Sequence, residues 1–85
     1  METAKDYSST EEVAIVVKVD ELLDEQNKYR VEYYLLKATG ILRVQFDKFR
    51  QHLLIIGFDP AQTDSSTILK HIKQQRLNAQ LIVGI

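Results

Sequence analysis

The order in which strand-like and helix-like patterns follow one another is the feature that most restricts the fold of this chain. Short runs rich in β-branched residues alternate with two longer stretches that carry apolar residues at helical spacing. These patterns predict strand, helix, strand, strand, helix and strand at residues 13–19, 25–39, 41–46, 53–58, 65–76 and 77–83. Two strand–helix–strand units joined by a hairpin form a ferredoxin-like βαββαβ sandwich, an α+β fold with a four-stranded antiparallel sheet and two helices on one face.

The first and third strands are predicted to lie in the middle of the sheet because they are the most apolar. Only Lys18 interrupts the apolar character of residues 13–19, and residues 53–58 are apolar almost throughout. In the second strand the alternation is clearer, and we expect a common face for Leu42, Val44 and Phe46.

Capping residues mark the ends of both helices. Asp24 is a suitable N-cap for the first helix, and Gly40 stands where a left-handed residue belongs after its end. Asp64 or Ser65 can cap the second helix. The residues expected to face the sheet are Val31, Tyr34, Leu35 and Ala38 in the first helix, and Ile68, Leu69 and Ile72 in the second.

The 85 residues suffice for one domain with a thin core, and no internal linker or repeat divides them. We expect residues 1–11, which are polar and small, to be a disordered tail, and residues 12–85 to be the domain. The chain has no cysteine, which excludes disulfides, thiolate metal sites and cysteine nucleophiles. Apolar packing alone must therefore stabilise the core.

Charge and hydropathy argue against several kinds of partner. The net charge is −1 and the basic residues are scattered, so no face favours nucleic acid. RNA binding is a weak alternative, because the outward positions predicted for the sheet are aliphatic rather than aromatic. No apolar run reaches the ~20 residues of a membrane span, and residues 1–12 do not have the pattern of a signal peptide. We therefore expect a cytoplasmic protein with no nucleic-acid or membrane partner.

Several segments resemble heavy-metal-associated domains, a family of metallochaperone-like modules, over residues 17–82. The run from Val31 to Leu35 (VEYYL) matches the VExxL segment in the family's first helix, and Gly40-Ile41 matches the glycine–valine pair that opens its second strand. Gly57-Phe58-Asp59-Pro60 resembles the aromatic-Asp-Pro turn after its third strand. The resemblance implies the same ferredoxin-like fold.

The metal-binding GMxCxxC motif of that family is absent. The spacing places its two cysteines at Asp24 and Asn27, its methionine at Leu22 and its glycine at Glu21. The family's Gly-Tyr pair, which packs beside the metal loop, corresponds to Arg76-Leu77. Because soft ions such as copper(I) need thiolate ligands, the resemblance implies a degenerate domain that keeps the fold without the thiolate site.

Carboxylates cluster in the loop that holds metal in the family. One alternative is therefore a metal-binding or metal-transport protein that uses Asp20, Glu21 and Asp24 as oxygen ligands, with a histidine as a further ligand. We expect His52 and His71 to be exposed and not to be ligands. The favoured interpretation is a solvated acidic loop at the positive end of the first helix, with no metal ion and no cofactor.

No catalytic pattern is present. The sequence has no nucleophile elbow, no phosphate-binding glycine loop and no recognisable Ser/His/Asp arrangement. We therefore do not expect an enzyme.

Two surplus apolar surfaces lead to the functional hypothesis. Tyr29, Tyr33 and Leu36 recur at i, i+4 and i+7, nearly opposite the residues that face the sheet. A second set should point outward from the central strands, namely Val16, Leu53 and Ile55. The tyrosines could instead pack over lysine stems or the tail, and a tail or a second copy could cover the sheet. We predict a non-catalytic protein-interaction module that binds a protein partner or self-associates through one of these surfaces.

Overall fold

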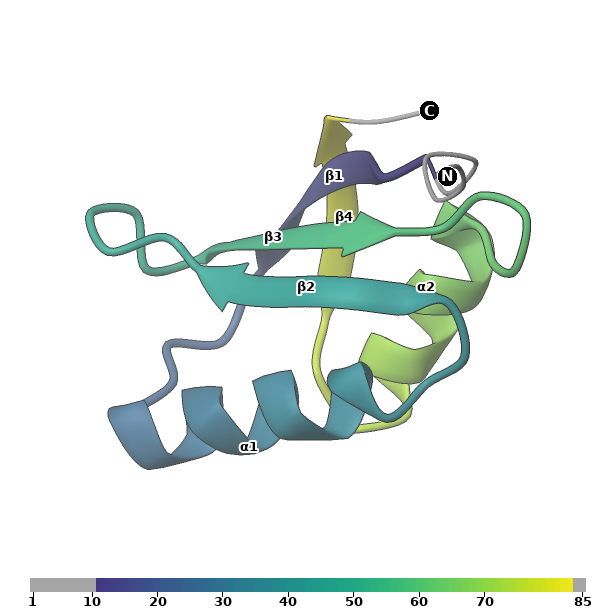
Figure 1. The fold of residues 1–85 in the computed structure, drawn as a ribbon. Coiled ribbons are helices and arrows are strands. Elements are labelled where there is room, and N and C mark those ends of the chain that lie inside the picture. Colours follow the sequence, from purple (N-terminus) through teal and green to yellow (C-terminus); the bar gives the residue numbers. More distant parts are fainter. Residues whose placement is uncertain (1–10, 84–85) are drawn as a thin grey trace, which may run out of the picture.

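The computed structural model describes residues 11–83, which form an open four-stranded sheet with two helices on one face (Figure 1). The elements are β1 (Val13–Val19), α1 (Glu25–Leu36), β2 (Ile41–Phe46), β3 (Leu53–Phe58), α2 (Ser65–Lys73) and β4 (Ala79–Val83). The strand order is β2-β3-β1-β4 and every pair is antiparallel, so the predicted fold and its two central strands are confirmed. Residues 1–10 of the predicted tail and residues 84–85 of the predicted domain lie outside the described part.

The core lies between the sheet and the two helices. In β1 and β3 the alternation places Ile15 opposite Ile56 and Val17 opposite Leu54, all four inaccessible to solvent. The helices cover the other side of the core, where Leu35 of α1 and Ile68 and Ile72 of α2 are buried. Burying one such side chain contributes about 1.5–3 kcal/mol, so this layer carries much of the stability of the domain.

The first helix ends at Leu36, three residues before the predicted end at Thr39. Its last turn tightens, because the Ala38 N–H donates to the Leu35 carbonyl rather than one residue further back. Gly40 then adopts a left-handed backbone (φ +84°), and a Cβ there would lie 2.9 Å from side-chain carbons of Gln62 and Thr63. Glycine is therefore required where the chain turns into β2, but it is not the helix cap that the sequence predicted.

The second helix also ends early, at Lys73 rather than Arg76. The N–H groups of Gln75 and Arg76 donate three residues back, to Ile72 and Lys73, and Arg76 has a left-handed backbone (φ 65°). This turn redirects the chain, so β4 begins at Ala79 and not at the predicted Leu77.

A bulge in β2 changes which residues face the core. The register with β3 shifts between Ile41 and Arg43, so Ile41 is buried and Leu42 is 42% exposed. The predicted common face of Leu42, Val44 and Phe46 is therefore wrong at Leu42, although Phe46 is buried as expected.

The open face of the sheet carries a contact that the sequence did not predict. The Arg43 guanidinium donates to the Glu12 carboxylate and forms an ion pair with it. Glu12 lies directly over Gly57 of β3, where a side chain would collide with the carboxylate. Hydrogen bonding to Glu12 raises the pKa of Arg43, and the pair joins the start of the domain to edge strand β2.

Candidate functional site

The loop between β1 and α1 uses its carboxylates for internal hydrogen bonds. Both oxygens of Glu21 accept from Asn78, at 2.9 and 3.2 Å from its backbone N–H and 2.9 Å from its side-chain amide. The hydrogen bond from the Asn78 backbone lowers the pKa of Glu21. Asp24 accepts from the Asn27 N–H at 2.8 Å and is the N-cap of α1, as predicted. The two positions that match the family's cysteines, Asp24 and Asn27, are thus joined by a capping bond.

The alternative metal ligands are not brought together. Among residues 11–83 no group of three or more histidine, aspartate or glutamate side chains is arranged to hold a metal ion. Asp20 is exposed, whereas Glu21 turns to Asn78 and Asp24 turns to its helix. Two of these three carboxylates, Glu21 and Asp24, therefore have structural partners within the chain.

Both histidines are half-buried, not exposed as the sequence predicted. His52 Nδ1 lies 2.8 Å from the Val19 carbonyl oxygen, just before β3 begins. His71 lies on α2 beside a hollow that is also lined by Tyr34 of α1 and by Ala38 in the turn after α1. They belong to different places in the fold, and each is explained by packing between neighbouring elements.

The outer side of α1 is apolar and exposed, as predicted. Tyr29 is 70% exposed, Tyr33 56% and Leu36 47%, although large apolar side chains on a helix usually face a core. The ammonium of Lys37 lies 4.6 Å from the centre of the Tyr33 ring, a cation–π contact at the surface. We call Tyr29, Tyr33 and Leu36 the α1 stripe. Tyr34, predicted to face the sheet, is instead 43% exposed on the side toward α2.

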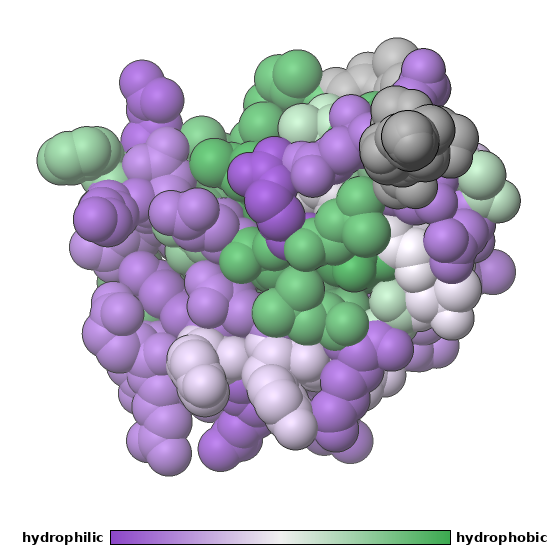
Figure 2. Space-filling model, viewed as in Figure 1, coloured by the Kyte–Doolittle hydropathy of each residue, from purple (hydrophilic) through white to green (hydrophobic). Residues whose placement is uncertain are grey.

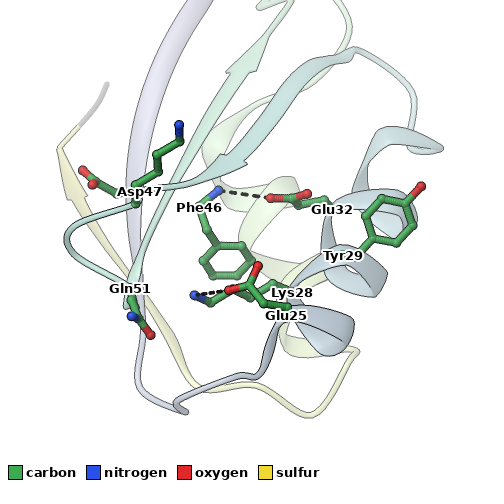
Figure 3. A pocket seen from close by; sticks show the side chains of 8 residues that line it. Glu25, Lys28, Tyr29, Glu32, Phe46, Asp47 and Gln51 are labelled. Carbon is green, nitrogen blue, oxygen red and sulfur yellow. Dashed lines mark hydrogen bonds and ion pairs between the residues drawn. The ribbon is translucent and has the colours of Figure 1, made fainter.

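A groove of about 450 Å³ lies between α1 and the end of β2 (Figure 3). Lys28 runs along its floor, nine-tenths buried, with its ammonium 3.6 Å from Glu25 and 5.7 Å from the centre of the Phe46 ring. The Glu32 carboxylate accepts from the Phe46 backbone N–H at 3.2 Å, so a side chain of the helix binds the edge strand. Tyr29 lines the same groove, which connects the α1 stripe to β2.

Sequence reasoning missed this groove because Lys28 has the spacing of an ordinary exposed helix cation. The signals that could have revealed it are Glu25 and Glu32, three residues before and four residues after Lys28, together with Phe46 at the end of a strand. Such pairs are common on solvated helices, and only the packing of α1 against β2 places Lys28 inside.

A second hollow, of about 510 Å³, lies on the other side of α1. Leu23, Val31 and Tyr34 line it together with Gln75 and Leu77 from the segment before β4. It is mostly apolar, and the side-chain nitrogen of Gln75 is buried there without a hydrogen bond. The predicted counterpart of the family's Gly-Tyr pair, Arg76-Leu77, therefore lies near α1 but offers no ligand.

The outward residues of the central strands are less exposed than the α1 stripe. Val16 pairs with Ile55 and Lys18 with Leu53, so the predicted residues do share the open face. These three residues, Val16, Leu53 and Ile55, are half-buried. None of them is among the large apolar residues with high exposure. The α1 stripe is thus the stronger of the two predicted surfaces.

Comparison with known proteins gives a clear result for the fold. No family model and no curated protein matches the sequence. A solved copper binding domain from HMA7, a P-type ATPase, superimposes with a TM-score of 0.77 at 19% identity, covering 85% of this chain and 96% of that one. Oxidized MerP from Ralstonia metallidurans CH34 gives 0.75 at 15% identity, over 86% of this chain and 100% of MerP. The chain has the fold of these domains.

A third solved structure has the same fold. The N-terminal domain of a potential copper-translocating P-type ATPase from Bacillus subtilis, in its Cu(I)-loaded state, matches with a TM-score of 0.74 at 13% identity, over 84% of this chain and 88% of that domain. The predicted likeness to heavy-metal-associated domains is confirmed in the fold, and the chain has no cysteine. Within residues 11–83, neither helix has the length and apolar character that a membrane span requires.

Proposed function

We propose that the chain is a non-catalytic protein-interaction module on a metallochaperone-like scaffold that lacks the thiolate metal site. The observation that carries this proposal is the α1 stripe, three large side chains exposed along one side of a helix whose opposite side already fills the core. Tyrosine provides a large contact area with a polar tip and is enriched at protein interfaces.

The chemistry of the β1–α1 loop supports the same proposal. With no sulfur ligand, and with Glu21 and Asp24 engaged by Asn78 and Asn27, the loop contributes to the stability of the fold. The half-buried sheet residues Val16, Leu53 and Ile55 form a second, weaker candidate surface. We place the module in the cytoplasm, as the sequence predicts, and assign it no catalytic role.

The test replaces the exposed rings without changing the core. We expect Tyr29→Ser combined with Tyr33→Ser to weaken association with a protein partner or a second copy by at least about tenfold, since exposed tyrosines are frequent hot spots. Binding is measured with the purified chain by titration calorimetry. Lys70→Ser combined with Lys73→Ser, two exposed positions on α2, is the matched control. Equal binding by both variants would remove the α1 stripe from the proposal.

A second candidate is a metal-handling protein that uses oxygen ligands. It is favoured by the copper binding named for the HMA7 domain and by the carboxylates at Asp20, Glu21 and Asp24. The test is a titration with copper(I), zinc, manganese and calcium while amide NMR shifts are recorded. Asp24→Asn is the informative variant, because asparagine still caps a helix but carries no charge. Localised shifts at residues 20–27 that Asp24→Asn abolishes would favour this candidate over the first.

A further inference from the structure

The α1 stripe lies next to a free edge of the sheet. β2 and β4 are the two edge strands, and α1 packs beneath β2 whereas α2 packs beside β4 (Figure 1). Among residues 11–83, an exposed apolar helix side lies beside the β2 edge and not beside the β4 edge, because Ile68 and Ile72 of α2 are buried and the exposed side of α2 carries Lys70 and Lys73. Figure 2 shows apolar side chains gathered over the strands, directly above paler side chains over α1.

Building on the proposed function, we infer that the partner is a second copy of this chain, bound about a twofold axis through β2 and the α1 stripe. In this arrangement the two β2 strands pair antiparallel and the two α1 helices pack side by side beneath the joined sheet. The surface consists of the α1 stripe, Leu42 and the outward backbone of Val44, and we call it the β2–α1 surface.

The backbone of β2 offers groups for such pairing. The Phe46 N–H donates to Glu32 of α1, outside the sheet, while the Asp47 N–H donates inward to the Leu53 carbonyl. Because alternate residues of a strand direct their N–H groups to the same side, the Val44 N–H also points away from β3. One outward group of the edge is therefore taken by Glu32, and the one at Val44 remains for a partner strand.

The α1 stripe reaches the β2 side of its helix at Tyr29. Tyr29 and Phe46 line one groove, whereas Tyr34 and Ala38 line a hollow shared with His71 of α2. Leu36 lies seven residues, close to two full turns, after Tyr29 and so shares its side. The stripe and the edge strand thus adjoin each other at the groove between Tyr29 and Phe46.

The spacing of the two layers fits a pair of identical chains. Paired strands lie about 4.8 Å apart, so a helix beneath the outer half of each sheet would lie roughly 8–10 Å from its counterpart. Helices pack at this distance, about 8–10 Å between axes. A single foreign strand would pair with β2 but would present a new free edge, whereas a second copy pairs both β2 edges and both stripes at once.

The charges of the edge strand tolerate self-association, whereas the stripe has two cations beside it, Lys37 over Tyr33 and Arg30 in the hollow between Tyr29 and Tyr33. β2 carries one charged residue, Arg43, and the carboxylate of Glu12 in the same chain neutralises it. The whole chain has a net charge of −1, so two copies repel each other weakly. Like charges opposite each other would otherwise destabilise paired strands.

The exposed apolar area is suitable for the centre of such an interface. Tyr29, Tyr33, Leu36 and Leu42 together leave on the order of 400 Å² accessible, given that an aromatic side chain can bury 150–250 Å². A stable interface buries about 800 Å² on each partner, of which a polar rim supplies a large part.

The contacts of Phe46 narrow down the part of the α1 stripe that lies near the proposed axis. Phe46 lies beside Lys28 and Glu32, and Val44 lies two residues earlier, roughly 7 Å along the strand. That distance equals about four to five helix residues, which counted from Lys28 and from Glu32 leads to residues 32–37, so an axis through Val44 passes close to the turn that carries Tyr33 and Leu36. Tyr33 and Leu36 of the two copies would then lie near each other at the axis.

Sedimentation equilibrium of the full chain, from about 10 μM to 1 mM, tests the inference with three variants. Tyr33→Glu places two carboxylates at the axis on an exposed side chain, and we expect it to raise the dimer Kd at least about tenfold. Val44→Pro removes the outward N–H at a position where an edge strand tolerates proline, and we expect a similar loss. Ser66→Glu, exposed on α2, adds the same charge elsewhere and should leave the Kd unchanged. An amide NMR spectrum confirms the fold of each variant.

The outcomes separate this inference from the proposed function. A dimer that Tyr33→Glu and Val44→Pro weaken, but Ser66→Glu does not, supports the β2–α1 surface. A wild-type chain that stays monomeric at about 1 mM overturns the inference, as does a dimer that Tyr33→Glu leaves intact. If Val44→Pro fails to fold, Tyr33→Glu alone decides the result. In a monomeric chain, loss of a different protein partner on changing Tyr29 and Tyr33 would still uphold the interaction module.

Discussion

The two helices of this domain have the same task on the inside and different surfaces on the outside. Each begins at an aspartate N-cap that accepts from a backbone N–H at 2.8 Å, and each buries aliphatic residues against the sheet. The exposed side of α2 is polar, whereas the exposed side of α1 carries two tyrosines and a leucine. Folding requires only the inner side of a helix, so the outer side of α1 calls for an explanation outside the fold.

The inner sides should be equivalent, and this is where the largest effects are expected. Leu35→Ala in α1 and Ile72→Ala in α2 both remove a fully buried side chain, and each should lower the free energy of unfolding by about 2–5 kcal/mol. Urea denaturation followed by circular dichroism measures the change. A cost under about 1 kcal/mol for Leu35→Ala alone would mean that α1 is not part of the core in the way α2 is.

A substitution at Lys28 of α1 should change the free energy of unfolding less than the core substitutions do. The Lys28 side chain is nine-tenths buried, and its ammonium has one ion pair at 3.6 Å, with the exposed Glu25, and a contact with the Phe46 ring at 5.7 Å. Lys28→Met should therefore leave the unfolding free energy within about 1 kcal/mol of the wild type or raise it, because it keeps the packing on Phe46 and removes a poorly compensated charge. Lys70→Met on the exposed side of α2 is the matched comparison. A large loss in Lys28→Met would show that the ammonium itself stabilises the groove.

Acid should affect α2 through its cap. The N–H of Thr67 lowers the pKa of Asp64, so this carboxylate stabilises the fold above its unfolded pKa and loses that contribution as the pH falls through its lower folded pKa. Glu21 behaves in the same way, since Asn78 lowers its pKa. We expect the urea midpoint to fall between about pH 5 and pH 3. The urea midpoint of the Asp64→Asn variant should fall less over this pH range. If the midpoint of the variant falls as steeply with pH as that of the wild type, Asp64 does not contribute.

The smallest expected effect concerns the outer sides. Tyr29→Ser with Tyr33→Ser should change the unfolding free energy by less than about 0.5 kcal/mol per substitution, the usual range for surface positions. The measurement uses dilute protein, because a dimer would make stability depend on concentration. A loss above about 1.5 kcal/mol would mean that the tyrosines belong to the fold and would remove the contrast between the helices.

The sequence predicted the strands more closely than the helix ends. The bounds of β1, β2 and β3 follow from alternation and flanking polar residues, and the structure reproduces them. Both helices end three residues early because backbone hydrogen bonds tighten the last turn, and one of them turns at Arg76, a residue type that gives no signal for a left-handed backbone. The local sequence pattern does not predict the residue at which a helix ends, because that residue depends on where the next strand must start.

The candidate surface was predicted in part. The spacing of Tyr29, Tyr33 and Leu36 was enough to place them opposite the core-facing residues, since helical geometry fixes that relation. The contribution of Leu42 depends on a bulge between two strands, and the burial of Lys28 depends on how α1 packs on β2. Both arise from tertiary contacts that a periodicity argument does not contain.

The Glu12–Arg43 pair above Gly57 has a practical consequence for anyone who shortens this chain or fuses another protein to it. A version that starts at Val13 would keep every strand and every core residue, yet it would uncover the backbone of a central strand at Gly57 and leave the Arg43 cation without that carboxylate. Boundaries drawn from secondary structure alone would cut through this contact. A shortened version should therefore begin at or before Glu11, so that Glu12 keeps a peptide bond on both sides.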